Sequence, residues 1–189
     1  MQYTTNYQSP LGSITLAADE TGLTGLWFEG QKYFALSLNK ENKKALPISE
    51  QTSECQAARD ILIAAGKWLD IYFSGNEPDF KLPLHFMGSA FQNEVWEILY
   101  QIPYGQTTTY GAIAKQLAKK KGLERMSAQA VGGAVAHNEI SIIVPCHRVV
   151  GTNGSLTGYA GGIDKKIALL KMEKACKDTF FIPEKSTAP

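Results

Sequence analysis

The chain has 189 residues, of which 44% are hydrophobic and 20% charged, and its formal net charge is +1. This balance is typical of a globular protein with one large or two small domains, and it excludes an intrinsically disordered chain. No apolar run approaches the roughly 20 residues that span a bilayer, and residues 1–5 lack the features of a secretory signal, so no membrane association and a cytoplasmic location are expected.

The first third of the chain shows the pattern of a β-meander followed by a helix. Residues 12–17 alternate between polar and apolar side chains, and residues 23–28 form a short apolar run. After a polar stretch, Ser53 and Gln56 have the spacing of a capping box. Apolar residues then recur at helical spacing as far as Ser74-Gly75, which predicts a helix that ends there.

Residues 76–88 contain two prolines and predict a linker between two domains. Beyond the linker the periodicity is helical, with a first helix that ends before Pro103-Tyr104-Gly105. A second helix begins near Thr109, and a third, residues 128–136, is capped by Ser127. Two short helices behind a longer one suggest a helix-turn-helix, although spacing alone fits any small helical bundle.

The third predicted helix has almost no large side chains. Its two glycines, Gly132 and Gly133, should each cost roughly 1 kcal/mol relative to alanine in a helix interior. Such a helix needs a bare surface, either for tight packing against another helix or for close approach to a nucleic-acid groove.

Positive charge is concentrated in the second half of the chain. Residues 1–85 carry 7 basic and 10 acidic side chains, whereas residues 86–189 carry 12 and 8. The basic excess lies mainly between Lys115 and Arg125. This excess permits contact with phosphates, but taken alone it favours a solvated, lysine-rich loop.

The three cysteines are Cys55, Cys146 and Cys176, and no pair has the spacing of a metal site or a redox motif. Reduced cysteines without a disulfide framework are therefore expected. Cys146 stands out because it follows Pro145 and an apolar run, residues 140–144, that predicts a buried strand. A thiol needs a base or a cation to become a nucleophile, and His147 and Arg148 are its neighbours. From these residues alone, an inert buried cysteine remains the stronger reading.

A longer set of motifs resembles the O6-alkylguanine-DNA alkyltransferases, also called methylated-DNA–protein-cysteine methyltransferases. The segment Ile143-Val144-Pro145-Cys146-His147-Arg148-Val149-Val150 is similar to the active-site signature of that family. The resemblance is strong from Phe91 to Glu173 and looser before. Further landmarks in the family order are Ser9-Pro10-Leu11-Gly12, residues 22–28, Ile102-Pro103-Tyr104-Gly105, Thr109-Tyr110, residues 130–134, Asn138 and residues 158–162.

The resemblance implies an α/β ribonuclease-H-like domain at residues 1–84. A mainly helical, winged-helix-like domain with a helix-turn-helix would follow at residues 85–178, with a tail at 179–189. It implies a DNA repair enzyme that flips O6-alkylguanine, mainly O6-methylguanine, out of duplex DNA, with O4-methylthymine as a second candidate substrate. The alkyl group would pass irreversibly to Cys146 in a single turnover. The resemblance implies neither a cofactor nor a metal, and it implies that the protein is a monomer.

The resemblance also assigns roles to individual residues. Cys146 would accept the alkyl group, His147 would act as its base through a water molecule, and Glu173 would orient His147. Tyr110 would donate a hydrogen bond to guanine N3, and Asn138 would order the active-site loops.

Other residues would bind the base or the DNA, with the third helix entering the minor groove. This set comprises Gln129, Ala130, Gly132, Gly133, Arg148, Val149, Tyr159, Ala160 and Lys166. Gln129 stands where many relatives have arginine. Glutamine lacks the charge and the flat stacking plane of that arginine. Ala160 replaces a serine of some relatives, which predicts room for bulkier alkyl groups. Arg148 is expected to be structural rather than catalytic.

Two other functions remain open for this sequence. A lesion-binding relative would flip the base without transfer, although such proteins replace the cysteine that is present here. An unrelated Cys-His hydrolase or acyl transferase would leave the helix-turn-helix and the glycine-rich helix without a purpose.

Overall fold

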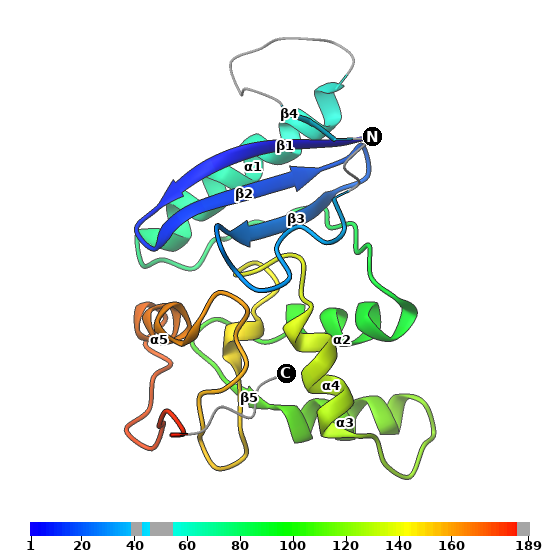
Figure 1. Cartoon of the computed structure of the whole chain (residues 1–189), viewed down its shortest axis with the longest axis vertical. Coiled ribbons are helices and arrows are strands. Elements are labelled where there is room, and N and C mark those ends of the chain that lie inside the picture. Colours follow the sequence, from blue (N-terminus) through cyan, green and yellow to red (C-terminus); the bar gives the residue numbers. More distant parts are fainter. Residues whose placement is uncertain (39–42, 46–54, 185–189) are drawn as a thin grey trace. The chain divides into compact units, whose positions relative to one another are not determined.

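The structure is a computed structural model that describes residues 1–38, 43–45 and 55–184 (Figure 1). It divides into two compact units, Met1–Met87 with Glu139–Ser141, and Gly88–Asn138 with Ile142–Pro189. Each unit has its own core. No helix in the described residues is long and apolar enough to cross a membrane.

The first unit is a four-stranded sheet with one long helix against it (Figure 1). The strands are β1 (Gln2–Ser9), β2 (Gly12–Ala18), β3 (Leu23–Phe28) and β4 (Lys43–Ala45), in the order β3-β2-β1-β4. Strands β1, β2 and β3 form an antiparallel meander, and β4 runs parallel to β1. The two strands predicted at residues 12–17 and 23–28 are confirmed.

Helix α1 (Gln56–Phe73) buries the apolar stripe predicted for it. Leu62, Leu69 and Tyr72 are at most 1% exposed, and the helix packs against β1, β2 and β3. The helix ends at Ser74, as predicted. At its start the N-cap is Cys55, whose side chain forms no capping bond, and Ser53 of the predicted capping box lies outside the described residues.

Part of the predicted linker is attached to this first sheet. The backbone N–H of Leu23 donates to the Pro83 carbonyl over 2.8 Å, and the His85 N–H donates to the Leu23 carbonyl over 2.9 Å. His85 Nδ1 also lies 2.6 Å from an Asp19 carboxylate oxygen. Residues 83–85 therefore pair with the backbone N–H and carbonyl groups of Leu23 at the start of β3.

The second unit contains four α-helices among its described residues: α2 (Ala90–Tyr100), α3 (Tyr110–Lys120), α4 (Ala128–Ala136) and α5 (Ile163–Met172). The short strands β5 (Thr108–Thr109) and β6 (Val149–Val150) pair in parallel. Ser89, Thr109 and Ser127 cap α2, α3 and α4, each accepting a hydrogen bond from a backbone N–H of the first turn. Helices α3 and α4 pack together as the predicted helix-turn-helix, although Lys119 and Lys120 belong to α3 rather than to the loop.

The prediction of a strand at residues 140–144 is wrong. Ile140 forms a single bridge to Leu26, and residues 141–143 form a turn in which Ile142 has a φ of 69°. All five residues are buried, so the apolar run reflects burial rather than strand pairing. A β-branched residue at this φ is strained, and it lies in the turn that comes shortly before Pro145.

Candidate active site

Cys146 begins a short 3-10 helix, η2 (Cys146–Arg148), which leads directly into β6. Its side chain is 3% exposed. The Asn138 side-chain amide donates to Cys146 Sγ over 3.1 Å and to the Val144 carbonyl over 2.7 Å. Asn138 therefore joins the end of α4 to the segment that carries the thiol.

The surroundings of the Cys146 thiol act in opposite directions on its acidity. Burial raises the pKa of the thiol and dominates. The Asn138 amide, the Lys166 ammonium and the backbone N–H groups of Cys146 and His147 oppose it, because each favours a thiolate. The site thus holds a neutral thiol. The hydrogen-bond donors and the cation that would stabilise its thiolate are already in place.

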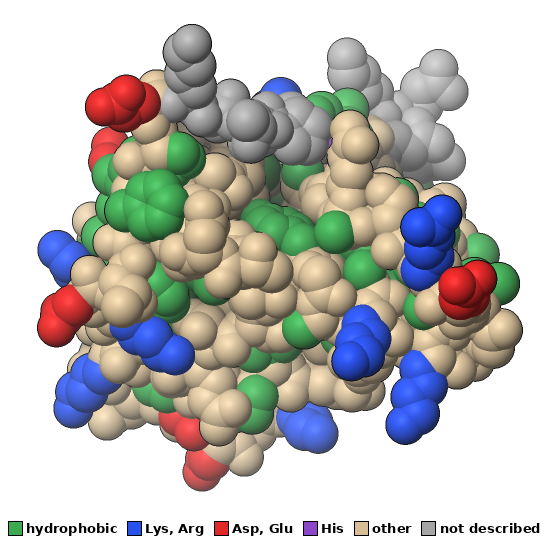
Figure 2. Space-filling model, turned by 90° about the horizontal axis from the view of Figure 1, so that it is seen from below, with side chains coloured by type: hydrophobic (Ala, Val, Ile, Leu, Met, Phe, Trp, Pro, Cys, Tyr) green, Lys and Arg blue, Asp and Glu red, His purple; other side chains and the backbone are tan. Residues whose placement is uncertain are grey.

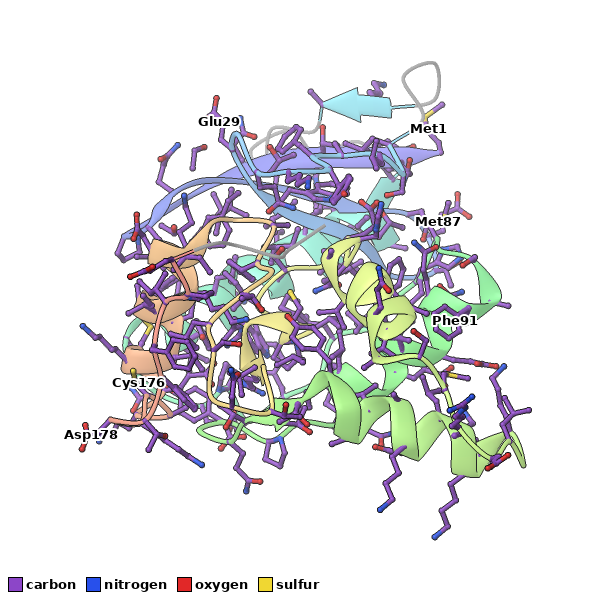
Figure 3. The ribbon with its side chains drawn as sticks, turned by 60° about the horizontal axis from the view of Figure 1, so that its bottom comes forward. Met1, Glu29, Met87, Phe91, Cys176 and Asp178 are labelled. Atoms are coloured by element: carbon purple, nitrogen blue, oxygen red, sulfur yellow. The ribbon has the colours of Figure 1, made fainter. Side chains whose placement is uncertain are left out.

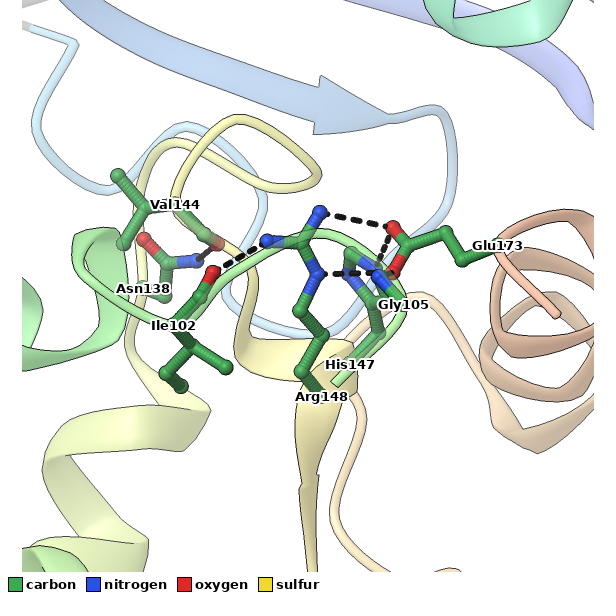
Figure 4. A network of polar contacts seen from close by, with 7 residues as sticks. All are labelled: Ile102, Gly105, Asn138, Val144, His147, Arg148 and Glu173. Atoms are coloured by element: carbon green, nitrogen blue, oxygen red, sulfur yellow. Dashed lines mark hydrogen bonds and ion pairs between the residues drawn. The ribbon is translucent and has the colours of Figure 1, made fainter. Parts of the chain in front are cut away.

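Glu173 is the centre of a buried network, shown in Figure 4. His147 Nε2 lies 2.7 Å from Glu173 Oε1, and Arg148 donates to both carboxylate oxygens over 2.8 and 3.0 Å. Arg148 also donates to the Ile102 carbonyl over 2.6 Å, and the Gly105 N–H donates to Glu173 over 3.4 Å. This fork–fork geometry fixes the carboxylate in one orientation.

These contacts determine the protonation of His147. Burial alone would raise the pKa of Glu173, but the hydrogen bonds and charges of His147 and Arg148 hold it well below its usual value. Burial also lowers the pKa of His147 despite the adjacent carboxylate. A neutral imidazole beside a carboxylate carries its proton on Nε2, which leaves the Nδ1 lone pair to accept a proton.

Lys166 and Tyr110 share one backbone acceptor. The fully buried Lys166 ammonium donates to the carbonyls of Val149 and Thr157, each over 2.7 Å. The Tyr110 hydroxyl donates to the same Thr157 carbonyl over 3.1 Å. Burial lowers the pKa of Lys166 to about 8 and raises that of Tyr110 to about 12.

Helix α4 exposes the small residues that the sequence places on it. Gln129 and Ala130 are exposed, Gly132 and Gly133 are half-buried, and Val131 is buried. A Cβ added to Gly133 would meet no atom within 4 Å. The opposite face of α4 is held by Trp96, whose indole N–H donates to the Ala134 carbonyl over 2.9 Å.

The two halves of the chain each match a family model. The segment 2–86 matches the ribonuclease-like domain of 6-O-methylguanine DNA methyltransferase, and residues 90–175 match its DNA-binding domain. The chain belongs to this family.

Individual relatives agree with this assignment. The methylated-DNA–protein-cysteine methyltransferase of Methanosarcina acetivorans is 41% identical over 170 residues, which cover 90% of this chain and 97% of the relative. A crystal structure of Mycobacterium tuberculosis OGT in complex with DNA is similar, with a TM-score of 0.73, 38% identity and 92% of each chain covered. A structure of the Mycobacterium tuberculosis O6-methylguanine methyltransferase has the same TM-score, with 37% identity over 98% of this chain.

In this member of the methyltransferase family, the residues predicted as catalytic occupy one part of the second unit. Asn138 contacts Cys146, and His147 contacts Glu173. Tyr110 shares the Thr157 carbonyl with Lys166, whose charge acts on Cys146. The Tyr159 ring lies edge-on to the His147 ring, with centroids 6.4 Å apart, and Ala160 follows it in the same segment. Arg148 is buried against Glu173, which gives it a supporting place in the network.

Several groups in this network were not anticipated from the sequence. Ile102 and Gly105 lie in a family landmark, but they contribute backbone atoms, as Thr157 does, so the sequence does not mark this role. The other two cysteines have different surroundings. Cys55 is the buried N-cap of α1, and Cys176 is exposed after α5, close to Asp178 in the chain (Figure 3).

Proposed function

We propose that the protein repairs O6-alkylguanine in duplex DNA by transferring the alkyl group to Cys146. Family membership gives the enzyme class, methylated-DNA–protein-cysteine methyltransferase, and its place in DNA repair. The observation that carries the residue-level proposal is the pair of contacts Asn138–Cys146 and His147–Glu173 around the one thiol in the signature. No cofactor or metal takes part in the proposed reaction.

The reaction begins with loss of the thiol proton. His147 accepts that proton at Nδ1 through a water molecule, while Glu173 stabilises the resulting imidazolium. The sulfur then attacks the O6-alkyl carbon in line, a C–S bond forms, and the C–O6 bond breaks. Its electron pair moves onto the purine, which finally gains the proton that the thiol lost. Guanine is restored and Cys146 becomes a thioether.

Stabilisation of the leaving purine is assigned to Tyr110. Its hydroxyl donates to guanine N3, in exchange for the Thr157 carbonyl that it contacts in the free protein. A donor aimed at charge that develops in the transition state lowers the barrier. Lys166 remains close to the thiolate and supports it before attack. The carbonyls of Cys146 and Val149 face the exocyclic amine and select guanine.

Base flipping and single turnover are part of the proposal. Cys146 is only 3% exposed, and the O6-alkyl carbon is unreachable for a buried thiol while the base is stacked in the duplex. The bare face of α4 is suited to the minor groove, where Gln129 helps to displace the base. The thioether has no carbonyl for water to attack, so each monomer acts once. O4-methylthymine is a second substrate.

Repair of a defined duplex tests the proposal. A duplex with one O6-methylguanine is incubated with protein, digested to nucleosides, and its guanine content is compared with that of the starting duplex. Wild-type protein should restore one guanine per protein molecule, and Cys146→Ser should restore none while still binding the lesion. Binding without repair by the wild type would favour the lesion-binding alternative. Repair by Cys146→Ser would refute the assignment of the acceptor.

A further inference from the structure

A hollow of about 610 Å³ lies between α3 and the turn that leads to α4. Apolar and basic side chains both line it, with Glu124 as the one carboxylate of the lining. The apolar part comprises Ala114, Ala118, Leu123 and Met126, and the basic part comprises Lys115, Lys119 and Arg125. Figure 2 shows Lys and Arg side chains projecting singly from the face seen from below.

The structure separates the lysine run into two groups. Lys120 and Lys121 form ion pairs with α2. The Lys120 ammonium lies 3.5 Å from Glu97, and the Lys121 ammonium lies 2.7 Å from Glu94. In contrast, Lys115, Lys119 and Arg125 line the hollow, and within the described part of the chain they form no ion pair. Sequence alone could not make this distinction, because the three lysines 119–121 are adjacent.

The three cations around the hollow favour an anion as its ligand. Lys115 and Lys119 are four residues apart on α3, and like charges at this spacing repel each other. Arg125 adds a third cation from the turn. A phosphodiester suits this lining, because its oxygens accept from ammonium and guanidinium groups while the sugar can contact the apolar side chains.

The position of the hollow relates it to the proposed reaction. It is lined by Gly111 and Ala128, which directly follow Tyr110 and directly precede Gln129. A phosphodiester held there would belong to the backbone of the same duplex whose base Tyr110 and Gln129 receive.

We propose that the hollow of Lys115, Lys119 and Arg125 binds a backbone phosphate of the DNA duplex. It thereby supplies the sequence-independent part of DNA affinity, whereas Lys120 and Lys121 do not. The inference rests on the proposed function for its partner, but it concerns affinity and not transfer. Each phosphate contact releases a counterion, so it adds about 0.9 to the slope of log K against log salt.

The test measures that slope for an undamaged duplex with five single variants. Lys115→Gln, Lys119→Gln and Arg125→Gln should each weaken binding at low salt and make the slope shallower, and the combined variant should lose about 0.9, the value for the one phosphate held there. Lys120→Gln and Lys121→Gln are matched controls in the same run, and they should keep the wild-type slope. All five positions are exposed, and circular dichroism should show unchanged folding.

Two outcomes would overturn the assignment of the hollow. One is a wild-type slope in a combined Lys115→Gln, Lys119→Gln, Arg125→Gln protein, the result expected if the hollow receives an acidic peptide instead. The other is an equal loss of slope in the two control variants. Methyl transfer from a duplex with one O6-methylguanine to the wild-type protein is measured in parallel. Failure of that transfer would refute the proposed function but not the phosphate site.

Discussion

His147 Nε2 lies 2.7 Å from Glu173 Oε1, and both side chains are completely buried. The carboxylate is held by Arg148 from its other side, so its position does not depend on His147 alone. This relationship keeps the His147 proton on Nε2 and leaves Nδ1 as the site that can take a proton from the thiol.

Glu173→Gln should slow methyl transfer by about 100-fold or more, because the imidazole loses both its orientation and the charge that stabilises its cation. Single-turnover rates on a duplex with O6-methylguanine measure the effect. Asp164→Asn changes an exposed acid in the first turn of α5, the helix that Glu173 caps at its C-terminal end, and this matched control should transfer at the wild-type rate. A Glu173→Gln protein that is folded and transfers as fast as the wild type would remove the carboxylate from the mechanism.

Asn138→Leu should raise the pKa of the Cys146 thiol further, since the anion loses its side-chain N–H donor. A hydrogen bond to a charged group contributes about 1.5–3 kcal/mol, so transfer at neutral pH should fall about tenfold or more. The rate should recover partly as the pH rises. Asn76→Ala, at an exposed turn of the first unit, should change neither the rate nor its pH profile. A pH profile of Asn138→Leu that coincides with the wild type would contradict the account.

Lys166 should make stability depend on pH in the alkaline range. Its pKa is about 8 in the fold and 10.5 for the unperturbed side chain, so between these values the unfolded chain binds more protons. Stability must then rise with pH across that window, by at most about 3 kcal/mol. The free energy of unfolding in urea is measured for the wild type and for Lys166→Met from pH 7 to 10. The wild-type value should rise with pH relative to that of the variant. A constant difference would show that the Lys166 charge is not suppressed by folding.

Gly133→Ala should stabilise the fold while weakening DNA binding. The added methyl meets no atom within 4 Å, and alanine is favoured over glycine in a helix by about 1 kcal/mol. The same methyl would stand on the bare face of α4 that the proposal places in the minor groove. Gly66→Ala in α1 also points into open space and is the control, expected to stabilise without changing DNA affinity. Equal DNA affinity of both variants would argue against groove entry by α4.

The helices of this protein could be predicted well because their signals are local. Thr109 and Ser127 cap the helices that follow them, and the apolar stripe of α1 is periodic. Strand β1 was not singled out because its threonine, asparagine and glutamine side chains give no apolar alternation. The turn at Ile142 could not be foreseen either, since a buried β-branched run looks the same in a strand and in a strained turn.

The candidate site was predicted as a set of side chains, but not as a network. Cys146, His147 and Glu173 were named from the family resemblance, whereas the fork from Arg148 to Glu173 depends on three-dimensional contacts. The shared acceptor of Lys166 and Tyr110 is a backbone carbonyl of Thr157, which the sequence cannot mark.

The most direct test of the central claim uses a duplex whose O6-methylguanine carries a trideuterated methyl group. After incubation with excess duplex, the protein is digested and its peptides are weighed. The account predicts one labelled methyl group per protein molecule, located on the peptide with Cys146, and none on the peptides with Cys55 or Cys176. A label on another residue, or more than one methyl group released per protein molecule, would contradict it.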